Sequence, residues 1–141
     1  MKNALLITLS LFLTFSCGNS SQKQEIAVDE SNEQLVIDTN TVYVYYFHGK
    51  QRCKTCMAVE KVAKEVIDSS FAAKPNVKFL VLLTEDQANK ALVEKYEIGW
   101  NSLIIAKGDN SVNITEEAFA NAIKKPEALV ELINKEINSR L

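Results

Sequence analysis

The feature that most constrains the fold of this chain is a pair of cysteines, Cys53 and Cys56, that lies between two segments of different character. The run TVYVYYF at residues 41–47 is β-branched and aromatic, which is typical of a buried strand. From Cys53 to about residue 70 the apolar residues recur every three or four positions, as they do on one face of a helix. Because positions i and i+3 of a helix are neighbours, the two sulfur atoms can meet.

The predicted helix has an apolar face and a charged face. The inward positions are Cys56, Val59, Ala63, Val66 and Ser70, and Val62 and Ile67 widen them. On the other side, oppositely charged residues stand four apart, so Glu60 is expected to pair with Lys64 and Lys61 with Glu65.

The rest of the chain alternates between strand and helix patterns. VKFLVLL at residues 77–83 predicts a second buried strand, which should run parallel to the first through a right-handed crossover. A helix over 86–95 and a strand over 102–106 follow, and GDN at 108–110 predicts a turn into an antiparallel strand. Helices are expected at 115–124 and 126–139. The fold class is therefore α/β, with a central mixed sheet of four to five strands flanked by helices.

The N-terminus has the pattern of an export signal. Lys2 precedes the apolar run ALLITLSLFLTF, which is shorter than the roughly 20 residues that span a bilayer. Cys17 follows the small residue Ser16, which resembles a bacterial lipobox and predicts a lipid on the Cys17 sulfur. A retained anchoring helix, or an ordinary signal peptide with a spare cysteine, are the alternatives.

This pattern divides the chain into three parts. We expect a lipoprotein signal peptide at residues 1–16, a polar flexible tether at 17–35 and one folded domain at 36–141. The mature protein is then anchored to a membrane and faces the periplasm or cell exterior, where disulfides persist. A composition of 47% hydrophobic and 24% charged residues is that of a folded protein. The net charge of −2, without a basic block, argues against nucleic acid, and a monomer is expected.

The cysteine pair has the chemistry of a redox site. Cys53 falls where the first N–H groups of the helix are unpaired and the helix dipole is positive. Lys50, Arg52 and Lys54 add positive charge nearby, which favours the thiolate. Cys53 is therefore the predicted nucleophile, and Cys56 the predicted resolving thiol. A disulfide that closes so small a loop adds little stability, so reversibility explains the pair better than stapling does.

Two segments carry a resemblance to a known family. YYFHGKQRCKTCMAVEKVAKEV and KYEIGWNSLIIAKGDN resemble the thioredoxin-like superfamily, over about residues 36–141. The resemblance implies a thioredoxin-like fold and thiol–disulfide exchange with a disulfide-bearing or dithiol protein. More narrowly, the lipobox with RCKTC is similar to small thioredoxin-like lipoproteins labelled nitrophenyl compound nitroreductase subunit. These tend to lie beside arsenic-resistance-type permeases, which suggests a permease as partner. The sequence has no flavin or nicotinamide fingerprint, so no cofactor is expected.

The chain departs from the superfamily at two places near the pair. The position of the family's cis-proline falls at Asn101, between Trp100 and Ser102. A non-proline cis bond costs about 2.5–4 kcal/mol, so we expect a trans peptide there. The family often buries an acid beneath the pair, whereas strand 41–47 contains none.

Other functions compete with thiol exchange. A structural zinc site is not expected, because it needs four ligands and only Cys53, Cys56 and His48 remain once Cys17 carries a lipid. Covalent haem is not expected either, because it needs a histidine at the position of Met57. A soft ion such as Cu(I), or arsenite, needs fewer ligands, and Cys53, Cys56 and His48 or Met57 are the candidates. The protein would then be a dithiol carrier. Two further alternatives remain. The cysteines could be small core residues without a redox role, or the protein could be an accessory subunit of a membrane complex whose cysteine pair has lost its function.

The residues around the pair have weaker signals. His48 is expected to close the strand, with catalysis as the alternative. Trp100 is expected to pack over the active-site loop, with substrate contact as the alternative. Lys54 and Thr55, between the cysteines, are expected to influence the reduction potential.

Overall fold

The structure of the protein is a computed structural model that describes residues 37–141. The predictions of a signal peptide at 1–16, of lipid attachment at Cys17 and of a tether at 17–35 lie outside the described residues. None of the helices within 37–141 combines the length and the apolar character needed to cross a membrane.

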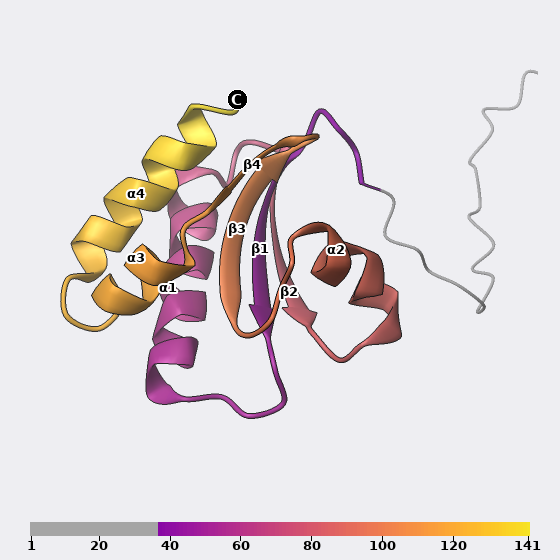
Figure 1. Ribbon diagram of the computed structural model, residues 1–141. Helices are drawn as coiled ribbons and strands as arrows, with labels where there is room; N and C mark the ends of the chain where they lie inside the picture. The colour runs from indigo at the N-terminus through magenta and orange to yellow at the C-terminus, as the bar shows by residue number, and fades with distance from the viewer. Residues whose placement is uncertain (1–36) are drawn as a thin grey trace, which may run out of the picture. The chain divides into compact units, whose positions relative to one another are not determined.

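The elements follow the predicted order (Figure 1). They are β1 (Val42–His48), α1 (Lys54–Ser70), β2 (Val77–Leu83), the 3₁₀ turn η1 (Gln87–Asn89), α2 (Lys90–Lys95), β3 (Ser102–Lys107), β4 (Asn110–Asn113), α3 (Thr115–Asn121) and α4 (Pro126–Asn138). The helix predicted over 86–95 is split, because the Asp86 carboxylate accepts the Ala88 N–H and caps a 3₁₀ turn first. The helix predicted over 115–124 ends at Asn121.

The four strands form one mixed sheet in the order β2-β1-β3-β4. Strand β1 runs parallel to β2 and antiparallel to β3, and β4 returns antiparallel beside β3. The parallel pair joined by α1 confirms the predicted βαβ unit. The protein has the α/β, thioredoxin-like fold that the sequence predicts.

Alternation along β1 builds a core on each face of the sheet. Val42, Val44 and Tyr46 belong to the core on one face of the sheet. Helices α1, α3 and α4 cover this face (Figure 1). Tyr43, Tyr45 and Phe47 point to the side covered by α2. Successive side chains of β1 therefore alternate between the two faces of the sheet, and each face is covered by its own layer of helices.

One predicted core position is wrong. Ser70 was expected on the inward face of α1, but it is exposed. The helix ends at this residue, and Phe71, which is 4% exposed, enters the core in its place.

The sheet register determines which segments meet at the end of the sheet where β1 stops and β3 starts. Phe47, near the end of β1, pairs with Ser102 at the start of β3. The loop 49–53 leaves β1 at this end and leads into α1, so it passes beside residue 101.

Candidate active site

Cys53 and Cys56 form a disulfide at the N-terminus of α1. Cys53 is the N-cap residue, and its sulfur accepts a hydrogen bond of 3.1 Å from the backbone N–H of Cys56. Cys53 is exposed, whereas Cys56 is only 3% exposed. A partner thiol or disulfide can therefore approach the outer sulfur, and the inner sulfur stays covered.

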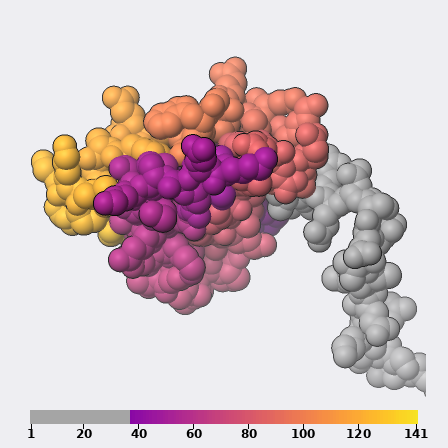
Figure 2. Space-filling model, turned by 90° about the horizontal axis from the view of Figure 1, so that it is seen from below, coloured from indigo at the N-terminus to yellow at the C-terminus, as the bar shows by residue number. Residues whose placement is uncertain are grey.

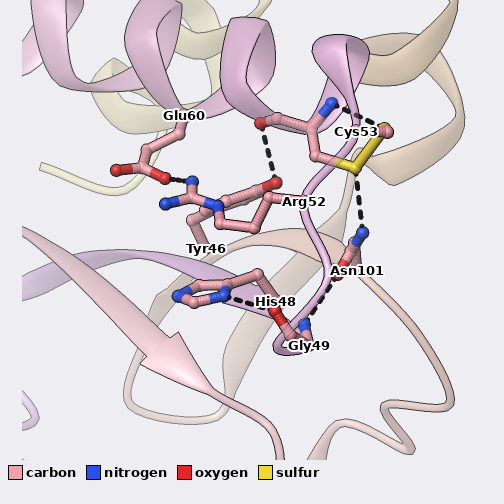
Figure 3. Close-up of a disulfide and its surroundings, with 8 residues drawn as sticks. Tyr46, His48, Gly49, Arg52, Cys53, Glu60 and Asn101 are labelled. Atoms are coloured by element: carbon pink, nitrogen blue, oxygen red, sulfur yellow. Dashed lines mark hydrogen bonds and ion pairs between the residues drawn. A yellow bond between two sulfur atoms is a disulfide. The ribbon is translucent and has the colours of Figure 1, made fainter.

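Tyr46 anchors the first turn of α1 to the sheet. Its hydroxyl donates a hydrogen bond of 2.8 Å to the carbonyl of Cys56 (Figure 3). Burial raises the pKa of Tyr46 above its ordinary value, although the nearby Arg52 cation offsets part of this. The phenol therefore stays protonated at neutral pH and remains a donor. The hydrogen bond from Tyr46 on β1 thus fixes the backbone of Cys56.

Asn101 contacts the inner sulfur directly. Its side-chain oxygen accepts the Gly49 N–H at 2.9 Å, and its side-chain NH₂ donates to the Cys56 sulfur at 3.1 Å (Figure 3). No cis peptide bond occurs among residues 37–141, so the expected trans geometry on both sides of Asn101 is confirmed. A hydrogen-bonding amide thus stands at the position where the superfamily that this chain resembles has a proline ring.

Two of the three cations predicted to favour the thiolate have acidic partners. Lys50 forms an ion pair with Glu85. Arg52 forms one with Glu60, as Figure 3 shows. Each carboxylate cancels part of the field that its partner exerts on the sulfurs. Lys54 is exposed to solvent. The electrostatic help available to Cys53 is therefore smaller than the sequence suggests, and the helix N-terminus supplies a larger share of it.

The predicted pairing along α1 is partly wrong. Glu60 pairs with Arg52 and not with Lys64, because loop 49–53 brings the guanidinium beside the helix. Lys64 pairs instead with Asp68. The predicted pair of Lys61 and Glu65 is present at 3.7 Å.

His48 lies at the end of β1 and is half-buried. Its ring stacks on Tyr46 with 6.0 Å between the ring centroids, and its Nδ1 lies 2.9 Å from the Gly49 carbonyl oxygen. This is the arrangement expected of a polar residue that closes a strand. Within the described part of the chain, no group of three or more His, Cys, Asp or Glu side chains could hold a metal ion.

A groove of about 640 Å³ opens beside the disulfide. In the view from below, the loop after β1 lies at the surface in the middle of this face, with C-terminal atoms to one side of it (Figure 2). The residues that line the groove are Gln51, Arg52, Cys53, Thr55, Cys56, Trp100, Asn101 and Phe119. Gln51 and Phe119 were not predicted as site residues, because nothing in their residue type or spacing distinguishes them.

Trp100 forms part of the rim of this groove. Its side chain is 60% exposed, and its ring lies 5.2 Å from that of Phe119 on α3, measured between centroids. Trp100 lines this groove together with Gln51, Arg52 and Cys53, and the expectation that it packs over the active-site loop stays a prediction. Trp100 exposes an aromatic ring at the rim of the groove that contains Cys53.

The comparisons with known proteins add little to this geometry. Neither the known protein families nor the curated proteins include a match to the chain. Six solved chains match it. One, described as the structure of a malarial protein, is 19% identical, with a TM-score of 0.47 and an alignment covering 69% of this chain and 98% of that one. A similarity this weak says nothing about function.

Proposed function

We propose that this protein is a membrane-anchored, extracytoplasmic thiol–disulfide oxidoreductase that acts through Cys53 and Cys56. The observation that supports it best is the asymmetry of the disulfide: the exposed residue Cys53 caps the helix, and its partner Cys56 is buried. A staple would gain nothing from this arrangement, whereas exchange requires one sulfur that a partner can reach.

The reaction consists of two successive thiol–disulfide exchanges. The Cys53 thiolate attacks a disulfide of a partner protein, forms a mixed disulfide and releases one partner thiolate. The Cys56 thiolate then attacks the Cys53 sulfur, which releases the second partner thiolate and leaves the Cys53–Cys56 disulfide. The partner is reduced and the pair is oxidised, and a second dithiol protein returns the pair to the reduced form. The same steps run in reverse when the partner is the dithiol.

Trapping the mixed disulfide tests this proposal. In Cys56→Ser the resolving thiol is missing, so Cys53 should accumulate as a mixed disulfide with a disulfide-bearing protein such as insulin. Both proteins also carry Cys17→Ser, so the matched variant Cys53→Ser retains only the buried thiol of Cys56 and should trap at least tenfold less. Equal trapping by both variants, or by neither, would exclude the proposed roles.

The membrane anchor is part of the same proposal and rests on the lipobox-like sequence ending at Cys17. We expect the protein expressed in a bacterial host to fractionate with membranes and to incorporate labelled fatty acid. Cys17→Ser should abolish both. A Cys17→Ser protein that still carries label would show that the lipid is attached elsewhere.

A further inference from the structure

We propose that Asn101 is a catalytic residue that stabilises the thiolate of Cys56 when this sulfur resolves a mixed disulfide. This role deepens the proposed function and rests on it. The proposal rests on a direct contact with a reacting atom: the side-chain NH₂ of Asn101 lies 3.1 Å from the Cys56 sulfur (Figure 3).

The Gly49 backbone determines which end of the amide faces the sulfur. A backbone N–H can only donate, so the group that meets it at 2.9 Å must be the Asn101 oxygen. The NH₂ end is therefore directed at Cys56. An amide NH₂ carries donors and no acceptor, so it can favour a thiolate but cannot take a proton from a thiol.

The inner sulfur needs such a donor. Cys56 is 3% exposed, and removal from water disfavours a charged sulfur. The outer sulfur already has a donor, the backbone N–H of Cys56, at 3.1 Å. Each sulfur therefore has one N–H donor, from the helix for Cys53 and from Asn101 for Cys56. When Cys56 loses its proton to solvent in the groove, the amide replaces part of the hydration that burial removes.

The other polar groups around the pair serve other partners. From β1, the Tyr46 hydroxyl donates to the Cys56 carbonyl, and the His48 ring contacts the Gly49 carbonyl. Beside the groove, Arg52 pairs with Glu60, and Lys54 is exposed. From the β3 and α3 sides the groove is lined by Trp100 and Phe119, which do not titrate.

A pH titration of the Cys56 thiolate tests the role without any partner protein. In Cys53→Ser, with Cys17 also replaced by Ser, Cys56 is the remaining thiol and its thiolate absorbs in the ultraviolet. Subtracting the Cys53→Ser/Cys56→Ser protein removes the tyrosine signal. Adding Asn101→Leu should raise the midpoint by about one pH unit, since it removes one hydrogen bond to the charged form.

Further variants make the result specific. Asn101→Asp keeps the acceptor for Gly49, removes the donor and adds a negative charge, so its midpoint should rise further. Asn101→Ala, which removes the amide without adding a charge, serves as the test if Asn101→Leu does not fold. Asn134→Leu removes a half-buried side chain whose NH₂ bonds to Val130 within α4, and should leave the midpoint unchanged.

The outcomes separate this inference from the proposed function. When Asn101→Leu is made in the protein that keeps Cys53 and Cys56 but carries Cys17→Ser, the mixed disulfide between Cys53 and insulin should persist several-fold longer before Cys56 resolves it. A midpoint that coincides with the parent's in Asn101→Leu, or in Asn101→Ala where the first variant does not fold, overturns the role of Asn101. A protein that exchanges no thiols, but whose Cys56 midpoint responds to Asn101, overturns the proposed function alone.

Discussion

Arg52 and Glu60 form an ion pair that joins the loop before α1 to the second turn of that helix (Figure 3). The two side chains are 31% and 25% exposed. The carboxylate thus partly neutralises the guanidinium that lies closest in sequence to Cys53. Glu60 therefore limits how strongly the loop favours the Cys53 thiolate.

Replacing Glu60 with Gln should make reduced Cys53 more reactive. The Arg52 charge is then uncompensated, and alkylation of Cys53 at neutral pH should accelerate about two- to fivefold, as expected for ~0.5–1 kcal/mol. Glu65→Gln is the matched control, because it removes an acid of the same helix that pairs with Lys61. Equal rates in the two variants would show that Glu60 does not act on the thiol.

Tyr45 and Tyr46 are adjacent on β1 and should respond oppositely to the loss of a hydroxyl. The Tyr45 hydroxyl is buried without a hydrogen-bond partner among the described residues, whereas that of Tyr46 bonds to Cys56. Tyr45→Phe should raise the free energy of unfolding by about 1 kcal/mol, and Tyr46→Phe should lower it by about 1 kcal/mol. Denaturant unfolding at neutral pH measures both. The same sign for both would contradict this assignment.

Alkaline pH should destabilise the protein through its buried phenols. Burial raises the pKa of Tyr45, Tyr46 and Tyr96, so the folded state keeps protons that the unfolded chain releases at about pH 10. The stabilisation is complete below about pH 10 and is lost as pH rises from there towards the folded-state pKa values. Unfolding at about pH 9 and about pH 11 should show the fall. It should be shallower in Tyr45→Phe, and an identical slope would argue against Tyr45 as a source.

Trp100 should matter for large partners and not for small ones. Its ring is exposed at the rim of the groove that contains Cys53. Trp100→Ala should therefore slow exchange with insulin several-fold and leave exchange with glutathione nearly unchanged. Val81→Ala is the control, because Val81 is also an exposed apolar residue but does not line the groove. A matching loss with glutathione would place the effect on the cysteines themselves.

Local patterns were sufficient to predict most of the fold. Strand β2 has the predicted bounds, and Cys53 stands at the start of α1 as predicted, where it is the N-cap residue. The boundaries that were missed, at residues 86–89 and 122–124, depend on a capping side chain and on where a helix frays. Neither leaves a strong periodic signal.

The surroundings of the pair were harder to predict, because they depend on long-range register. The sequence marks Asn101 only as a residue where proline is expected. That its amide reaches Cys56 follows from the pairing of Phe47 with Ser102, which aligns the start of β3 with the end of β1. The choice of Arg52 over Lys64 as the partner of Glu60 likewise depends on the path of a loop, which the four-residue rule for helices does not include.

We predict that the Cys53–Cys56 disulfide is reversible, and its reduction potential tests this most directly. The protein, with Cys17→Ser, is equilibrated in glutathione buffers of graded ratio and its free thiols are counted after an acid quench. We predict one two-electron transition at a potential above about −300 mV, the limit below which structural disulfides lie. The transition should be identical from the oxidised and the reduced side. A pair that stays oxidised across the whole series would contradict the account.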